Sequence, residues 1–124
     1  MSEQTNGKKV LLVEDDTFLQ GISATKLAKE GYTVITAGTA EDAIKKLADK
    51  PDILLLDLVL PGGDGYSVLQ AMKDTGVTLP VIVFSNLTTD EDVAKAKEMG
   101  AKEYMVKSNF TLDELIEKIK VYLV

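Results

Sequence analysis

Residues 51–65 read PDILLLDLVLPGGDG, and this stretch decides the fold. From Ile53 to Leu56 it is an unbroken apolar run bounded by turn residues, which is typical of a strand buried on both faces of a parallel sheet. Asp57 ends the run, and the proline and glycines after it favour a loop. Asp57 is therefore predicted at the open edge of a sheet, where α/β proteins bind ligands. The alternative is an acid that only caps the next turn.

The composition indicates one domain of 124 residues, 45% of them hydrophobic, with no cysteine and no histidine. The chain therefore cannot build a disulfide, a zinc site with thiolate or imidazole ligands or a histidine-based catalytic triad, and it cannot itself carry a phosphohistidine. Fourteen basic and twenty acidic residues give a net charge of −6. This charge disfavours nucleic acid or an anionic membrane as a direct partner, so we expect protein partners.

The sequence shows no sign of export or of a membrane anchor. Residues 1–7 are polar and are expected to form a flexible N-terminal tail ahead of a domain at 8–124. No apolar run approaches the ~18 residues that a membrane helix needs. We therefore expect a cytoplasmic protein without membrane insertion.

Strand and helix patterns alternate along the chain. Short apolar or β-branched runs predict strands at 9–13, 33–37, 53–56, 81–84 and 103–106. Amphipathic stretches predict helices, caps included, at 17–30, 39–48, 64–76, 89–99 and 111–123. Five strands alternating with five helices predict an α/β fold with a five-stranded parallel sheet and right-handed crossovers.

Local signals mark the ends and the buried faces of the helices. Thr39, Thr89 and a Thr111–Glu114 capping box are predicted to begin helices, and Gly31 is predicted as a left-handed C-terminal cap. The helix at 89–99 has few and small apolar residues, so we expect weaker anchoring there. Phe18 falls at the margin of the first helix's apolar stripe. The buried faces of the first two helices are expected to carry Leu19, Ile22, Ser23 and Leu27, and Ala40, Ala43, Ile44, Leu47 and Ala48.

Polar residues follow four of the five predicted strands. Glu14 and Asp15 follow the first strand, Asp57 the third, Ser85 the fourth and Lys107 the fifth. The carboxyl ends of parallel strands lie at one edge of the sheet, so these side chains are expected to converge. Singly, each has a simpler interpretation, as a helix-terminus acid, a turn residue or a solvated lysine. Together they indicate a site.

The chemistry of this set indicates a metal-assisted phosphoryl site. Three gathered carboxylates repel one another unless a cation neutralises them, and oxygen-only ligands favour Mg²⁺ or Mn²⁺ over zinc. An aspartate carboxylate such as that of Asp57 can act as a nucleophile. Lys107 and Ser85 would place a positive charge and a hydrogen-bond donor around a phosphoryl group on Asp57.

Four segments of the chain resemble the receiver domain of two-component response regulators. They are LLVEDD (11–16), LLDLVLPGGDG (55–65), VIVFSN (81–86) and GAKEYMVK (100–107). The resemblance covers essentially the whole chain and is closest in kind to single-domain, chemotaxis-type receivers. It implies a flavodoxin-like (βα)5 doubly wound fold with strand order 2-1-3-4-5.

The resemblance also implies a role for each polar residue at the edge of the sheet. Asp57 would be the phosphoacceptor and Lys107 the phosphoryl-binding lysine. The switch residues would be Ser85, as the hydroxyl, and Tyr104, as the aromatic. The Mg²⁺ ligands would be Asp57, Asp15, Glu14 (often through water) and the backbone carbonyl of Val59. Asp16 lies outside the matching pair of acids.

The chain departs from the family pattern after two of these residues. Asn86 follows the switch hydroxyl, where the family usually has a small residue. Ser108 follows Lys107, where the family usually has proline. A cis bond before serine costs roughly 3 kcal/mol, so we expect a trans peptide between Lys107 and Ser108.

The expected function is that of a stand-alone receiver, a signalling domain rather than an enzyme. It would accept a phosphoryl group on Asp57 from the phosphohistidine of a histidine kinase or histidine phosphotransfer protein. The donor would dock near the first helix, around Phe18. The downstream protein target would bind the face formed by the fourth helix, the fifth strand and the fifth helix, with no direct contact to nucleic acid.

Three alternatives are open, and two of them belong to other classes of protein. A degenerate receiver would act as a phosphorylation-independent interaction module, but the acid, hydroxyl and lysine set is complete. An FMN-binding redox module shares the strand order, but the acids at 14–16 would repel the FMN phosphate. A haloacid-dehalogenase-type phosphatase needs a second acid two residues after the nucleophile, where this chain has Val59.

Overall fold

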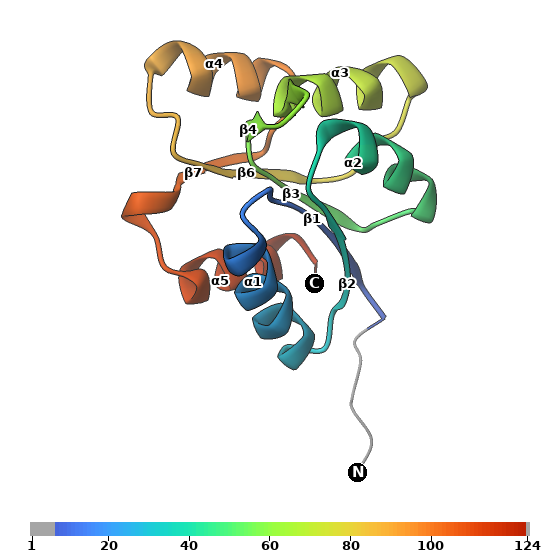
Figure 1. The fold of residues 1–124 in the computed structure, drawn as a ribbon, viewed down its shortest axis with the longest axis vertical. Coiled ribbons are helices and arrows are strands. Elements are labelled where there is room, and N and C mark those ends of the chain that lie inside the picture. The colour runs from blue at the N-terminus through green and yellow to red at the C-terminus, as the bar shows by residue number, and fades with distance from the viewer. Residues whose placement is uncertain (1–6, 124) are drawn as a thin grey trace.

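The computed structural model describes residues 7–123, and residues 1–6 of the predicted tail lie outside that range. Within it, one sheet contains five parallel strands in the order β2-β1-β3-β6-β7 (Figure 1). Numbered by themselves in chain order, these strands have the predicted order 2-1-3-4-5, which confirms the expected fold class. Their bounds are β1 Lys9–Val13, β2 Thr33–Ala37, β3 Ile53–Leu56, β6 Val81–Ser85 and β7 Glu103–Val106.

The register aligns the carboxyl ends of the strands. Val13 of β1 is paired with Leu56 of β3, and Leu56 is paired with Val83 of β6. At the other side of β6, Ser85 is paired with Val106 of β7. The residues that follow these pairs therefore come out at the same edge of the sheet.

Helices cover both faces of the sheet, as a doubly wound fold requires. In Figure 1, α1 and α5 lie on one side of the sheet, and α2, α3 and α4 lie on the other. Each side has its own apolar core, because alternate strand residues point to opposite faces. The helix bounds are α1 Thr17–Lys29, α2 Ala40–Lys46, α3 Gly65–Thr75, α4 Asp90–Glu98 and α5 Leu112–Tyr122.

The central strand and the predicted caps are as expected from the sequence. All four residues of β3 are buried, at 0–1% exposure. The side chains of Thr39, Thr89 and Thr111 cap α2, α4 and α5, and Thr111 forms the full capping box with Glu114. Gly31 has a φ of +95°, the left-handed region that glycine adopts readily.

Three residues predicted on buried helix faces are exposed instead. Ile22 is 41% exposed and Ile44 is 36% exposed. Each isoleucine is the sequence neighbour of a buried residue, Ser23 or Ala43, and a helical neighbour points about 100° away around the axis. Ala48 is exposed because α2 ends at Lys46 and the chain continues in a tighter 3-10 turn.

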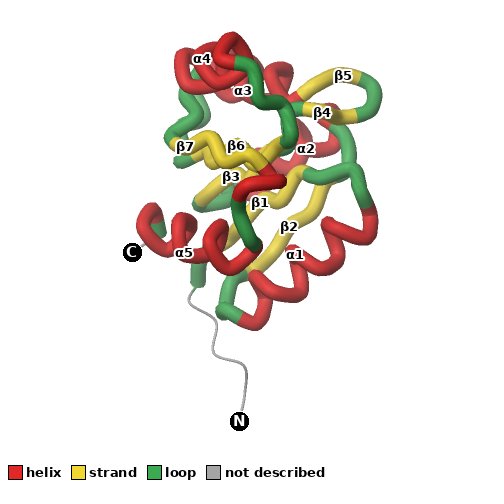
Figure 2. Tube along the Cα trace, turned by 90° about the vertical axis from the view of Figure 1, so that its left-hand side faces the viewer, coloured by secondary structure: helices red, strands yellow, loops and turns green. Residues whose placement is uncertain are grey.

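A small hairpin replaces the simple loop predicted after Asp57. β4 (Val59–Leu60) pairs antiparallel with β5 (Gly63–Asp64), and Figure 2 shows them as an arch beside α3. Pro61 followed by Gly62 at a φ of +70° is the residue pattern of a type II turn, which closes the hairpin.

The chain folds back closely behind the hairpin. A Cβ added to Gly65 would lie 2.6 Å from the backbone oxygen of Asp57, so a residue with a side chain would displace the strand end there. The Gly65 N–H donates to the Leu58 carbonyl at 3.0 Å.

The Lys107–Ser108 peptide is trans, as predicted, and a 3-10 turn at Lys107–Asn109 follows β7. Among residues 7–123, none of the helices is long and apolar enough to cross a membrane.

Candidate functional site

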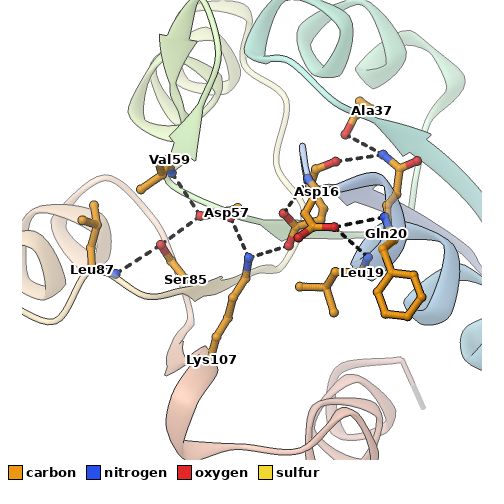
Figure 3. A network of polar contacts seen from close by, with 11 residues as sticks. Asp16, Leu19, Gln20, Ala37, Asp57, Val59, Ser85, Leu87 and Lys107 are labelled. Atoms are coloured by element: carbon orange, nitrogen blue, oxygen red, sulfur yellow. Dashed lines mark hydrogen bonds and ion pairs between the residues drawn. The ribbon is translucent and has the colours of Figure 1, made fainter.

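The ends of β1, β3, β6 and β7 bring the predicted polar side chains together (Figure 3). Asp57 is at the centre and is only 6% exposed. Its Oδ1 accepts hydrogen bonds from the Ser85 hydroxyl at 2.9 Å and from the Val59 N–H at 3.0 Å. Its Oδ2 accepts from the Lys107 ammonium at 2.7 Å. Both oxygens are thus held in a fixed direction.

Lys107 bridges two buried carboxylates. Its Nζ bonds Asp57 and also the Oε1 of Glu14, which is 4% exposed. Burial lowers the pKa of Lys107, but the hydrogen bonds to Asp57 and Glu14 outweigh burial and raise that pKa above its ordinary value. Lys107 is therefore a protonated, positive group at neutral pH.

Glu14 is held at both of its oxygens. Its Oε1 bonds Lys107, and its Oε2 accepts the backbone N–H of Asp16 at 3.1 Å. Burial raises the pKa of Glu14 above its ordinary value, although these two hydrogen bonds pull it down. A positive charge near Glu14 would therefore stabilise its ionised form.

The three acids proposed as metal ligands lie close together. Glu14, Asp15 and Asp57 each offer a carboxylate oxygen within 4.8 Å of the others. Glu14 and Asp57 are buried, whereas Asp15 is exposed. A cluster of oxygens that is buried on one side and open on the other fits Mg²⁺, which usually keeps several waters and binds few carboxylates.

Two other predicted site residues lie beside this cluster. The backbone N–H of Val59 faces Asp57, while the metal-ligand role of its carbonyl stays a prediction. The hydroxyl of Tyr104, on β7, donates to the Leu87 carbonyl at 2.7 Å. The Leu87 N–H in turn donates to the Ser85 hydroxyl at 3.4 Å. Ser85 and Tyr104 are thus linked through the loop that leads into α4.

Asp16 has a structural role, in agreement with its place outside the predicted pair. Its Oδ1 accepts the backbone N–H groups of Phe18 and Leu19, both at 3.0 Å, and so caps α1. Sequence reasoning missed a neighbouring contact. The Gln20 side-chain amide donates to the backbone oxygens of Glu14 and Ala37. The available signal was a polar residue in the first turn of a helix that follows three acids.

Comparison with known proteins identifies the family. Residues 10–120 match the family described as "Response regulator receiver domain", so the chain belongs to that family. Receiver domains are signalling domains that take phosphoryl groups from histidine kinases. This assignment confirms the resemblance to receiver domains that the four sequence segments show.

Similar curated proteins differ in how much of their length the chain covers. Protein PilG of Pseudomonas aeruginosa is 33% identical over 126 residues, which is 99% of this chain and 93% of PilG. The transcriptional regulatory protein AfsQ1 of Streptomyces coelicolor is 37% identical over 99 residues, 79% of this chain and 44% of that protein. The chain spans about half the length of such transcriptional regulators.

Solved structures show the same fold. The receiver domain of the Francisella response regulator 1452 matches with a TM-score of 0.86 and 26% identity, over 94% of this chain and 96% of that one. A CheY-like response regulator receiver domain protein from Methanospirillum hungatei matches with a TM-score of 0.84 and 29% identity, over 92% and 91%.

Proposed function

We propose that this chain is a stand-alone response regulator receiver that accepts a phosphoryl group on Asp57 with the help of Mg²⁺. The observation that carries the proposal is the way Asp57 is held, with one oxygen on Lys107 and the other on Ser85 and the Val59 N–H. A carboxylate oriented by a cation and two donors is prepared to attack phosphorus and to keep the product in place.

Each residue of the site has a separate task in that reaction. Asp57 attacks the phosphoryl group, so that a P–O bond to Asp57 forms as the bond to the donor breaks and the donor leaves without the phosphoryl group. Lys107 offers positive charge to the phosphoryl oxygens, and Ser85 offers a hydrogen bond. Glu14, Asp15, Asp57 and the Val59 carbonyl would hold Mg²⁺ or Mn²⁺, which supplies charge neutralisation when bound.

The metal requirement follows from the charge balance. Glu14, Asp15 and Asp57 with a phosphoryl dianion place about five negative charges beside a single lysine, so transfer is expected to need a divalent cation. The PilG match covers 93% of that protein, so the family includes a curated relative of about this length. We further propose that it acts in the cytoplasm, with a histidine kinase or histidine phosphotransfer protein as donor.

The output is proposed to be phosphorylation-dependent protein binding at the face formed by α4, β7 and α5. The contacts from Ser85 through Leu87 to Tyr104 support this, because a shift of the hydroxyl toward a phosphoryl group would disturb them. The complete set of contacts at Asp57 argues against a degenerate receiver. The buried, acidic Glu14 argues against a phosphate-binding flavin site.

Intact mass after incubation with acetyl phosphate and Mg²⁺ tests the proposal. We expect one phosphoryl adduct, its absence in Asp57→Asn, and its absence when EDTA replaces Mg²⁺. An adduct that forms equally well in EDTA would contradict the metal requirement, and an adduct in Asp57→Asn would contradict the site. No adduct on the folded parent protein would favour the degenerate receiver.

A further inference from the structure

Gln20 connects the first turn of α1 to the ends of two strands. Its side-chain Nε2 donates to the Glu14 carbonyl at 2.9 Å and to the Ala37 carbonyl, at the end of β2, at 3.3 Å (Figure 3). The Ala37 carbonyl also accepts the Glu14 N–H at 2.9 Å. Gln20 itself is anchored, because its backbone N–H donates to the Asp16 carbonyl at 2.8 Å.

These contacts fix the backbone on both sides of Glu14. The Glu14 carbonyl belongs to the planar peptide that joins Glu14 to Asp15, and the Glu14 N–H belongs to the peptide before it. Gln20 holds the first of these peptides and Ala37 holds the second. These two planes fix the Cα–Cβ direction of Glu14. The peptide after Asp15 is restrained as well, because the Asp16 N–H donates to the Glu14 Oε2 at 3.1 Å, so the Cα–Cβ direction of Asp15 is restrained relative to Glu14.

Asp15 depends on this restraint more than Glu14 does. The Glu14 carboxylate has its own partners, Lys107 and the Asp16 N–H. Asp15 is exposed, and its carboxylate makes no hydrogen bond or ion pair within the described part of the chain. The direction of the Glu14–Asp15 peptide is therefore the main restraint on where the Asp15 carboxylate lies before a cation binds.

We propose that Gln20 is a positioning residue for the acidic metal site, acting through the Glu14–Asp15 peptide. The inference rests on the proposed function, because it presupposes a cation at Glu14, Asp15 and Asp57. Mg²⁺ demands near-ideal octahedral geometry, whereas Ca²⁺ accepts flexible geometry at longer distances. Loss of the positioning contact is thus expected to weaken Mg²⁺ binding more than Ca²⁺ binding.

The test is calorimetric titration of Gln20→Met with Mg²⁺ and, separately, with Ca²⁺. Methionine has similar length but donates no hydrogen bond. Removal of a contact that orients a metal ligand typically costs 10-fold or more, so we expect about 10-fold weaker Mg²⁺ binding and less than about 3-fold weaker Ca²⁺ binding. A residue that only supported the fold would lower both affinities equally.

Gln70→Met is the matched control. Gln70 bonds Asp74 at 2.8 Å on the exposed side of α3, so its loss removes a glutamine contact that involves none of the site residues. We expect this variant to bind both ions like the parent protein. Gln20→Glu is a second variant in case Gln20→Met does not fold. Its added charge attracts both ions, so the ratio of the two affinities remains informative.

The outcomes separate this inference from the proposed function. If the parent protein binds no Mg²⁺, both are wrong. If the parent binds Mg²⁺ but the Gln20 variants keep its Mg²⁺ to Ca²⁺ affinity ratio, Gln20 has no positioning role and the proposed function stands. Unfolding of both Gln20 variants would also overturn the inference, because it would make Gln20 a purely structural residue.

Discussion

Three consecutive acids follow β1, and the structure holds each one differently. Glu14 is buried against Lys107, Asp15 is exposed, and Asp16 caps α1 with its side chain. Neighbouring residues of the same chemistry therefore have different energetic roles. Asp15 adds to the repulsion among the acids of the site, whereas Asp16 stabilises a helix end.

Paired substitutions of Asp15 and Asp16 are predicted to have opposite effects. In EDTA, Asp15→Asn should raise the free energy of unfolding slightly, because it relieves repulsion with Glu14 and Asp57, and it should abolish Mg²⁺ binding. Asp16→Ala should lower the free energy of unfolding by about 1 kcal/mol through loss of the cap. It should still bind Mg²⁺, because the Asp16 N–H that holds Glu14 remains.

Urea unfolding measures the free energy of unfolding of both variants, and Mg²⁺ titration measures their affinity for the ion. Loss of Mg²⁺ binding in Asp16→Ala alone would reverse the assignment.

The residues around Asp57 predict a long-lived phosphoryl group. Hydrolysis needs a water held in line with the phosphorus, and a polar side chain at the edge of the site can orient it. The family resemblance places the residues two after the phosphoacceptor and two after the switch hydroxyl nearest to that water. Here they are Val59, which is 55% exposed, and half-buried Leu87. Neither side chain can hydrogen-bond water.

Decay of the Asp57 adduct in Mg²⁺ buffer tests this prediction. Leu87→Glu should shorten the lifetime, because a carboxylate can orient water where leucine excludes it. Asn86→Ala is the control, since Asn86 is an exposed amide at the same loop. An unchanged rate in Leu87→Glu would refute the apolar shield. Markedly slower decay in Asn86→Ala would show that the amide was placing the water.

Among the helices, α4 has the thinnest apolar anchor, as the sequence predicted. Of its nine residues, Ala96 is the buried one. Polar contacts to α3 add to this anchor: the Tyr66 hydroxyl donates to Asp92 Oδ1 at 2.8 Å, and the Lys95 ammonium lies 4.1 Å from the centre of the Tyr66 ring. Thr89, the N-cap, donates to the other Asp92 oxygen at 2.7 Å. Asp92 therefore joins the start of α4 to α3.

Tyr66→Phe is predicted to loosen α4 selectively. The variant keeps the aromatic ring under Lys95 but removes the hydroxyl that donates to Asp92. Amide hydrogen exchange in Asp90–Glu98 should become several-fold faster, while exchange in α5 stays unchanged. Tyr122→Phe is the matched control, because its hydroxyl bonds Glu103 beside α5. Equal exchange of α4 in the two variants would show that the Asp92 contact does not anchor it.

The same contact has a predicted pH dependence. Hydrogen bonds from Thr89 and Tyr66 lower the pKa of Asp92 below its ordinary value. Their stabilising effect is therefore complete above the ordinary aspartate pKa and is lost as the pH falls through the lowered pKa. Between those pH values, the unfolding free energy of Tyr66→Phe should change less steeply with pH than that of the parent. Identical slopes in acid titrations of stability would contradict this.

The sequence predicted those elements whose signals are local. β3 was recognisable because four buried residues in a row have no exposed face, and the helix starts were recognisable because threonine caps act on residues three positions away. The site followed from topology, since parallel strands must present their carboxyl ends together. The parallel direction of the strands, rather than detailed packing, places Glu14, Asp57 and Ser85 side by side.

Packing determines the features that the sequence pattern does not predict. Ile22 and Ile44 fit an apolar stripe by spacing, but their smaller neighbours Ser23 and Ala43 take the buried places. The hairpin of β4 and β5 depends on the turn at Pro61–Gly62, and a loop interpretation fits the same residues. Gln20 was missed because its partners are backbone carbonyls, and a polar residue in the first helical turn does not by itself indicate which carbonyls it binds.

The whole molecule has two candidate binding surfaces, one at the start of α1 and one along α4, β7 and α5. β7 is an edge strand, with α4 on one face of the sheet and α5 on the other, so α4, β7 and α5 together border one side of the domain (Figure 1). Phe18 lies in the first turn of α1 and is 76% exposed. An exposed aromatic beside the phosphoacceptor edge suits docking of a phosphodonor, while the α4, β7 and α5 surface remains free for a target.

Phe18→Ala and Val121→Ala are predicted to separate these two surfaces. Both replace an exposed apolar side chain, since Val121 on α5 is 64% exposed, and so both should fold like the parent. Phe18→Ala should slow phosphoryl transfer from a phosphorylated histidine phosphotransfer protein by about 10-fold, as loss of an aromatic contact at an interface does. It should leave phosphorylation by acetyl phosphate unchanged, because a small donor needs no docking surface.

Val121→Ala should show the reverse pattern. Transfer from the phosphotransfer protein should match the parent, because α5 lies outside the donor surface, while affinity of the phosphorylated protein for its target should fall. Rapid-quench transfer assays and binding titrations with phosphorylated and unphosphorylated protein measure the two effects. If Phe18→Ala slows acetyl phosphate and protein donors equally, Phe18 acts on the chemistry at Asp57 rather than on docking. If Val121→Ala alone slows transfer from the protein donor, the donor docks on α5, and the assignment of the two surfaces is wrong.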